Sequence, residues 1–264
     1  MKQRDSGLCV KAEFRRELRM GLESHNPHES CSRKQVVAFS GGKDSTAMVL
    51  RMAELGEEFD VLFTPTMDEP LDVFDFIGDI ELRLGKKIIC PKAPTLMGLI
   101  RQFNALPNWR QRWCTRLIKI VPCIAYLQAH PGSTLCVGLR ADEPERTGLY
   151  GDYATYRYPL RDWNWGVCEV LSYLHQANVR VPKRTNCRLC YDQGLRDWYR
   201  LWQEEPGVWA VGEELEAEYG HTFRSPSRDT WPASLAALRQ EFESGRKPRG
   251  LDKEPKERCK VCRM

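Results

Sequence analysis

The chain has 264 residues, of which 42% are hydrophobic and 29% are charged, and its formal net charge is +4. This length can bury a full α/β core, and the near-average composition excludes wholesale disorder. No apolar run approaches the length of a bilayer span, and the charged stretch 1–33 lacks the apolar centre of a signal peptide. We therefore expect a cytoplasmic protein.

Three regions of the chain differ in their sequence pattern. Residues 1–34 carry a short helical pattern and then a polar stretch, which predicts an N-terminal helix and a linker. Strand-like and helix-like segments alternate over residues 35–182, which predicts right-handed βαβ crossovers and a mostly parallel sheet. Residues 183–264 combine helix-like segments with two Cys-x-x-Cys pairs, and we interpret them as a helical extension with a basic tail.

The first strand, turn and helix of the second region form the most informative stretch. Val36–Phe39 is an apolar, β-branched run typical of a buried strand, and helical spacing is established from Ser45 onward. The turn between them contains Ser40, Gly41, Gly42, Lys43, Asp44, Ser45 and Thr46. Glycines allow the backbone to approach a ligand closely, and the helix start directs N–H groups and its positive dipole end at the turn. The turn therefore predicts a phosphate cradle.

Further strands and helices are expected along the chain in alternation. The expected strands are 59–64, 87–90 and 134–140. The expected helices are 74–84, 96–103, 117–128 and 167–175, and residues 202–242 are expected to form a helical appendage with tryptophans in its core. Ligands gather at the carboxyl ends of strands in open α/β sheets, so we expect Asp68 and Glu69 near the ligand of the cradle.

Two basic segments suggest anionic partners. Residues 107–116 interrupt the helical pattern with three arginines, which could clamp phosphate or sulfate, and with Trp109 and Trp113, which could stack exposed bases. Residues 246–263 contain eight basic and three acidic residues. This tail could contact a nucleic acid backbone, or it could equally be a solvated terminus.

Several motifs resemble one family. Ser40–Ser45 resembles the PP-loop of the adenine nucleotide α-hydrolase superfamily. Gly138-x-Arg140-x-x-Glu143-x-x-Arg146 resembles a segment of the phosphoadenylylsulfate (PAPS) reductase family, as do 112–122 and 158–163. This resemblance implies a Rossmann-like, doubly wound α/β fold that binds ATP or a PAPS-like adenylate together with Mg²⁺.

The resemblance also implies roles for individual residues. Lys43 and Arg140 would neutralise phosphate charge during catalysis, and Asp44 would lie where a phosphate-bound magnesium ion is held. The expected nucleotide-binding residues are Ser40, Gly41, Gly42, Lys43, Asp44, Ser45, Thr46, Asp68, Gly138 and Arg146.

Among eleven cysteines, Cys187 and Cys190 form one Cys-x-x-Cys pair, and Cys259 and Cys262 form another. This spacing suits a metal or cluster, and nearby arginines are expected to favour the thiolates. The resemblance adds Cys114, because cluster-bearing relatives place cysteines in that segment. Either four of these five cysteines bind a [4Fe–4S] cluster, or the two pairs bind zinc. A redox-active tail pair without metal and plain free thiols are the alternatives.

The resemblance implies an enzyme that activates a substrate by adenylylation with release of pyrophosphate, for sulfur transfer to a nucleic acid or a small molecule. A sulfur donor or a thiol reductant protein would be its partner. The chain lacks the C-terminal Glu-Cys-Gly-x-His motif of PAPS reductases, although a thiol-dependent sulfonucleotide reductase using Cys259 or Cys262 is the alternative. A non-catalytic module that binds an adenine nucleotide is the second alternative.

Overall fold

The computed structural model describes residues 34–148 and 150–251. The chain divides into two units between residues 32 and 33, and the described residues belong to the second unit. The expected N-terminal helix and the tail from residue 252 onward, with Cys259 and Cys262, lie outside the described residues. None of the described helices is both long and apolar enough to cross a membrane.

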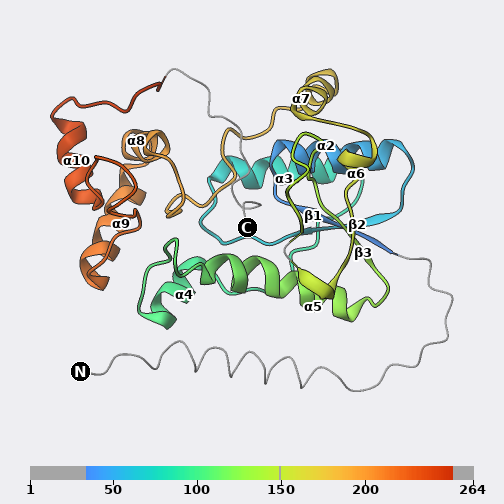
Figure 1. The fold of residues 1–264 in the computed structure, drawn as a ribbon, viewed down its shortest axis with the longest axis horizontal. Coiled ribbons are helices and arrows are strands. Elements are labelled where there is room, and N and C mark those ends of the chain that lie inside the picture. Colours follow the sequence, from blue (N-terminus) through green and yellow to red (C-terminus); the bar gives the residue numbers. More distant parts are fainter. Residues whose placement is uncertain (1–33, 149, 252–264) are drawn as a thin grey trace. The chain divides into compact units, whose positions relative to one another are not determined.

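A parallel sheet forms the centre of the described part of the chain (Figure 1). Its strands are β1 (Gln35–Phe39), β2 (Phe59–Phe63), β3 (Thr134–Cys136) and β4 (Thr155–Arg157), in the order β2-β1-β3-β4. In register, Gln35 of β1 pairs with both Phe59 and Thr134, and Thr134 pairs with Thr155. The chain winds outward from β1 in both directions, so the topological switch point lies between β1 and β3.

Helices between the strands, and α6 and α7 after them, lie around the sheet, whereas α8, α9 and α10 come later in the chain and lie to one side of it (Figure 1). They are α2 (Lys43–Glu54), α3 (Leu71–Leu84), α4 (Leu96–Phe103), the π-helix η1 (Thr115–Ile120), α5 (Val121–Ala129), the 3₁₀ turn η2 (Gly151–Tyr153), α6 (Pro159–Asp162), α7 (Val167–Gln176), α8 (Leu195–Glu204), α9 (Pro206–Tyr219) and α10 (Leu235–Glu243).

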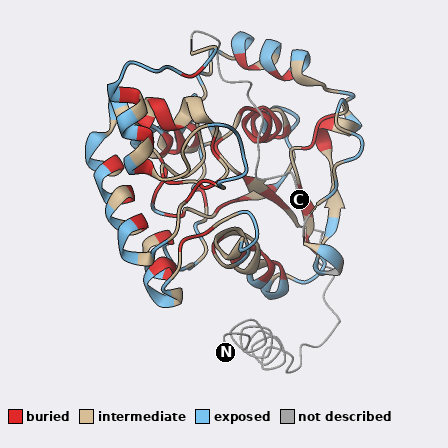
Figure 2. Ribbon diagram, turned by 60° about the vertical axis from the view of Figure 1, so that its left-hand side comes forward, coloured by how far each residue is buried: buried red, intermediate tan, exposed pale blue. Residues whose placement is uncertain are grey.

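Apolar residues on the two faces of the sheet pack against different helices. Val37 and Phe39 of β1 face a core that is closed by residues of α2, α3 and α7. Val36 faces the other side, where Cys123 and Leu127 of α5 cover the sheet. Figure 2 shows these buried residues in the strands and on the inner sides of the helices. The predicted doubly wound, parallel α/β fold is therefore confirmed.

The C-terminal helices share a core with an earlier part of the chain. Trp198 of α8 and Trp209 of α9 are almost wholly buried, which confirms the predicted packing role of the tryptophans. Their cluster also contains Ile100 of α4 and Ile118 of η1. The helical extension is thus packed onto α4 and η1, and this contact holds the residues before α8 close to the sheet.

The structure differs from the expected elements at three points. The expected strand 87–90 forms only one parallel bridge, between Leu62 and Ile89, because Pro91 follows directly and has no N–H to extend the ladder. Strand β4 was not foreseen, since its three residues show no apolar alternation. The helix expected at 117–128 begins as the π-helix η1, a rare form that is frequent at functional sites.

Candidate functional site

The turn after β1 has the geometry of an anion cradle. Gly41 has a φ of +72°, a left-handed conformation that side chains rarely adopt. Gly42 is the N-cap of α2 and has no side chain to accept from the first helical N–H groups, which leaves them for a ligand. The hydroxyl of Ser45 accepts from the N–H of Ser40 at 3.2 Å and donates to the carbonyl of Gly42 at 3.1 Å. These bonds hold the turn open around the helix start.

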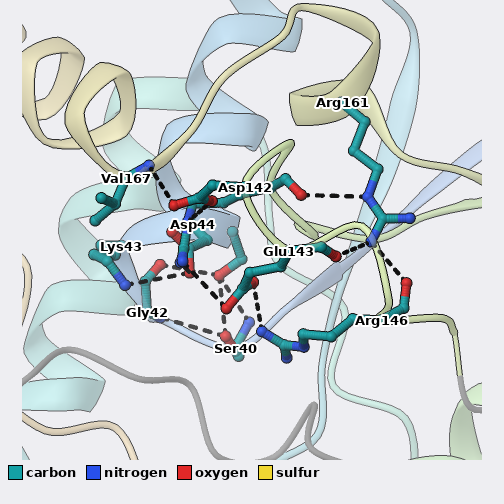
Figure 3. A network of polar contacts seen from close by, with 11 residues as sticks. Ser40, Gly42, Lys43, Asp44, Asp142, Glu143, Arg146, Arg161 and Val167 are labelled. Atoms are coloured by element: carbon teal, nitrogen blue, oxygen red, sulfur yellow. Dashed lines mark hydrogen bonds and ion pairs between the residues drawn. The ribbon is translucent and has the colours of Figure 1, made fainter.

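A network of ion pairs links Asp44 in this turn to the loop that follows β3 (Figure 3). Oδ2 of Asp44 receives Nζ of Lys43 at 3.3 Å and Nη1 of Arg140 at 3.0 Å. The Arg140 guanidinium also forms ion pairs with the carboxylates of Asp142 at 2.8 Å and Glu143 at 3.1 Å. Burial raises the pKa of Asp44 in spite of both cations. The other oxygen of Asp44, Oδ1, is buried and accepts no hydrogen bond from any described residue.

Arg161 fixes the loop that carries Arg140, a role that sequence reasoning missed. Its guanidinium donates to the carbonyls of Arg140 (3.3 Å), Glu143 (2.5 Å) and Arg146 (2.7 Å), as Figure 3 shows in part. Arg146 in turn pairs with Glu143 at 2.6 Å. Arg161 belongs to the 158–163 segment that resembles the family, and this motif was the available signal.

A cavity of about 210 Å³ opens over the turn at the carboxyl ends of β1, β2 and β3. Seven of the ten residues predicted to bind the nucleotide line it, namely Ser40, Gly42, Lys43, Asp44, Ser45, Gly138 and Arg146. Gly41, Thr46, Asp68 and Arg140 belong to the same neighbourhood but are not among the lining residues. Further lining comes from segments 62–64, 115–123 and 181–186, and it includes Lys119, Lys183 and Arg184.

Asp68 contacts the cysteine turn 187–190. Its Oδ2 accepts from the N–H of Leu189 at 3.0 Å, its carbonyl accepts from the N–H of Arg188 at 2.7 Å, and its carboxylate lies 3.5 Å from the Arg188 guanidinium. Asp68 thus holds this turn against the loop after β2. Sequence spacing could not reveal the contact, because Asp68 and Leu189 are 121 positions apart.

Glu69 is the acidic residue of this loop that lines the cavity. Its Oε1 accepts from the N–H and the hydroxyl of Thr66, each at 2.8 Å, while Oε2 is buried without a hydrogen bond from the described residues. Met67 between them has a φ of +63°, an uncommon conformation for a residue with a side chain. The conformation of this loop therefore places Asp68 against the cysteine turn and Glu69 at the cavity.

The cysteine turn begins where one lining segment of the cavity ends. Nη2 of Arg184 donates to the carbonyl of Cys187 at 2.5 Å, and Sγ of Cys187 lies 3.1 Å from Oγ1 of Thr66. Burial raises the pKa of Cys187 to about 12, and it also raises the pKa of Cys190 and Cys114. Nearby arginines were expected to favour the thiolates, but desolvation outweighs the neighbouring cations at all three sulfurs.

The metal hypothesis finds mixed support. Among the described residues, no three His, Cys, Asp or Glu side chains are placed to hold one metal ion, and Cys259 and Cys262 lie outside that part of the chain. Four side-chain N–H groups, on residues within three sequence positions of Cys114 or Cys187, are nevertheless buried without hydrogen-bond acceptors among the described residues. These are Nε of Arg112, Nε1 of Trp113, Nε of Arg184 and Nε of Arg188. Such donors fit a bound group that carries acceptor atoms and negative charge.

The family of the chain follows from a direct comparison. The family model of the phosphoadenosine phosphosulfate reductase domain matches residues 34–183, more than half of the chain. The chain belongs to this family. The matched range covers the sheet, the cradle and the 140–146 loop, which confirms the PAPS reductase-like resemblance inferred from the motifs. The family carries the name of an enzyme domain that acts on an adenine nucleotide.

Similar proteins include two from Methanocaldococcus jannaschii. "Uncharacterized protein MJ0066" is 24% identical over 210 residues, which cover 74% of this chain and 44% of the relative. "Uncharacterized protein MJ0973" is 21% identical over 243 residues, which cover 83% of this chain and 58% of the relative. The chain thus spans about half the length of these curated relatives.

Two solved structures are also similar to this PAPS reductase family member. One is the PAPS reductase from Candida auris in complex with phosphate, with a TM-score of 0.46, 13% identity and coverage of 69% of this chain and 90% of that chain. The other is the U34-tRNA thiolase NcsA from Methanococcus maripaludis with its [4Fe-4S] cluster. It has a TM-score of 0.46, 18% identity and coverage of 97% of this chain and 88% of that chain.

Proposed function

We propose that this family member binds ATP, or a related adenylate, in the cavity at the carboxyl edge of its sheet. The observation that carries the proposal is the open start of α2 after Gly42, with Lys43 and Asp44 among the lining residues. Backbone N–H groups at a helix start bind phosphate, and Lys43 would add positive charge.

The cavity has an apolar part that suits an adenine ring and a polar, basic part that suits phosphates. Leu62, Cys123, Val137 and Tyr150 line the cavity and also pack together in the apolar cluster next to α5. An adenine ring would be desolvated against these side chains. The cradle, Lys119 and Arg184 line the rest of the cavity and would meet the phosphates.

Asp44 would hold a magnesium ion on these phosphates. Its buried Oδ1 has no hydrogen-bond partner among the described residues, and a carboxylate oxygen is a ligand that Mg²⁺ prefers. The ion would neutralise phosphate charge. Arg140 pairs with Oδ2 of Asp44 and so orients the carboxylate, while Lys43 contributes a second positive charge at the same atom.

We propose that the nucleotide serves to activate an acceptor. An acceptor oxygen would attack the α-phosphate, the bond to the β-phosphate oxygen would break, and pyrophosphate would leave. Sulfur would then displace AMP from the adenylate. The cysteine turn follows cavity-lining Asn186 directly, so a sulfur-handling group would lie beside the nucleotide. A nucleic acid or a small molecule is the acceptor, and a sulfur donor or thiol reductant protein is the partner.

We further propose that Cys187 and Cys190 bind a [4Fe–4S] cluster, with zinc as the alternative. Cys259 and Cys262, or Cys114, would complete the ligand set. The support is the four buried N–H donors on residues within three sequence positions of Cys114 or Cys187, for which a thiolate-bound cluster would offer acceptor sulfurs and negative charge. A cluster there would supply a redox-active sulfur centre.

Binding and turnover test the proposed function. Calorimetry with ATP and Mg²⁺ should give a heat of binding that Lys43→Ala and Asp44→Ala abolish, while Lys87→Ala, which changes an 88% exposed lysine, should bind as the parent does. Pyrophosphate release from ATP supports adenylylation, and sulfite release from PAPS supports the alternative sulfonucleotide reductase, for which family membership is the favouring observation. Tight binding with neither product supports a binding module. If all three variants bind ATP with the affinity of the parent, the proposal that residues 40–46 bind its phosphates is contradicted.

A further inference from the structure

A second hollow, of about 250 Å³, lies outside the nucleotide cavity and shares none of its lining residues. We call it the aromatic hollow. It is lined by Trp109, Tyr191, Asp192, Phe223, Ser225, Ser227 and Arg228. The cysteine turn separates the two sites along the chain, because residues 181–186 line the nucleotide cavity and residues 191–192 line the aromatic hollow.

The aromatic hollow has one exposed aromatic ring at its edge. Trp109 is 57% exposed, whereas Tyr191 and Phe223 are buried. The guanidinium of Arg110 lies 4.8 Å from the centre of the Trp109 ring, so it covers one of the two ring faces. With more than half of its surface exposed, Trp109 retains ring surface on which a second planar group could stack. An exposed tryptophan beside buried aromatic residues is a stacking platform for a base.

Three arginines and one acidic lining residue, Asp192, lie at or near the hollow, and this excess of positive charge favours an anionic chain. Arg110 and Arg112 come from the loop before η1, and Arg228 comes from the loop between α9 and α10. Arg228 donates to the carbonyls of Tyr191 at 3.3 Å and Asp192 at 3.1 Å, which fixes it at the rim. Arginines on two separate loops can meet phosphates on both sides of one nucleotide.

The aromatic hollow also adjoins the cysteines. Tyr191 follows Cys190 directly, and the guanidinium of Arg112, two positions before Cys114, lies 6.0 Å from the centre of the Tyr191 ring. Tyr191 is thus a common wall of the hollow and the cysteine turn. The nucleotide cavity and the aromatic hollow are thus lined by the residues directly before and directly after the cysteine turn.

We propose that the aromatic hollow binds an unpaired nucleotide of a single-stranded nucleic acid. Its base would stack on Trp109, and its flanking phosphates would pair with Arg110 and Arg228. This inference rests on the proposed function, because it names the acceptor of the sulfur chemistry as a nucleic acid and gives its entry point. A duplex keeps its base faces stacked and would not place one on Trp109.

Fluorescence anisotropy of the full chain with labelled oligonucleotides tests this inference. The probes are a single-stranded RNA, a single-stranded DNA and a duplex of the same sequence. Trp109→Ala should weaken single-strand binding by about tenfold, because one stacked base is lost, and Trp109→Phe should restore most of the affinity. Tyr153→Ala, which removes a 48% exposed aromatic ring elsewhere, should bind as the parent does. The RNA and DNA arms identify the kind of strand.

A salt titration and an ATP measurement separate the possible failures. Arg110→Ala should lower the slope of log affinity against log salt by about one, whereas Arg51→Ala, at an exposed pair with Glu54, should leave the slope unchanged. All five variants should bind ATP with Mg²⁺ as the parent does. Equal binding of Trp109→Ala and parent, no single-strand binding, or equally tight duplex binding overturns the inference while leaving the nucleotide proposal intact. Loss of ATP binding in the parent itself overturns the proposed function instead.

Discussion

Gly138→Ala is the sharpest test of how the sheet supports the cradle. Gly138 follows β3, and a Cβ added there would lie 3.1 Å from N of Ser45, 3.2 Å from C of Asp44 and 3.3 Å from Cα of Ser45. All three atoms are backbone at the start of α2, and no flexible side chain can yield. The helix start must therefore move away from β3 by a few tenths of an ångström.

The expected loss of stability in Gly138→Ala follows from the added methyl group in a site that is already filled. An extra methyl group in a well-packed site costs about 1–3 kcal/mol of folding free energy. If the strain is relieved by moving the first turn of α2, its N–H groups leave the position that binds phosphate. We then expect the affinity for ATP with Mg²⁺ to fall by about tenfold, which corresponds to about 1.4 kcal/mol. The measurements are urea unfolding and calorimetric titration.

Gly78→Ala is the matched control. Gly78 lies within α3, and an added Cβ there meets no atom within 4 Å. Alanine should raise the free energy of unfolding by about 0.5–1 kcal/mol, because glycine loses more backbone freedom in a helix. It should leave ATP affinity unchanged. If Gly138→Ala unfolds and binds ATP as the parent does, the inferred close approach of β3 to the cradle is wrong.

Three further predictions concern the cysteine turn and the helical extension. Asp68→Asn removes the charge that faces Arg188 and should lower the free energy of unfolding by about 1–3 kcal/mol. A thiol reagent should then label Cys187 faster than it does in the parent, and an unchanged labelling rate would contradict this role of Asp68. Cys187→Ser combined with Cys190→Ser should remove most iron and zinc by elemental analysis, and equal metal content in parent and variant would refute the metal site. Burial raises the pKa of Glu216 from 4.5 to about 7, so its stabilising contribution is full below pH 4.5 and is lost as the pH rises through 7. Urea unfolding should show that the free energy of unfolding falls by roughly 3 kcal/mol across this pH window, and that this pH dependence is much smaller in Glu216→Gln. The same pH dependence in the variant and the parent would contradict the role of Glu216.

The sequence by itself determined the features that depend on local pattern. The strand, glycine turn and helix around residues 36–50 are encoded by apolar runs, by glycines and by helical spacing within 15 consecutive residues. The family motifs at 138–146 and 158–163 are equally local, which is why the family could be recognised before the fold was known. The roles predicted for individual site residues stay predictions, although seven of the ten nucleotide-binding candidates line one cavity.

Only the tertiary structure decided which side chains are desolvated and which groups they meet. Asp68 and Glu69 are neighbours in sequence, but one holds the cysteine turn and the other lines the cavity, because the loop around Met67 sends them in different directions. The thiol of Cys187 has a raised pKa because residues far along the chain bury it, and charges counted in the sequence predicted the opposite. Desolvation and long-range pairing depend on the packed neighbours of a group, and its position in the chain does not specify them.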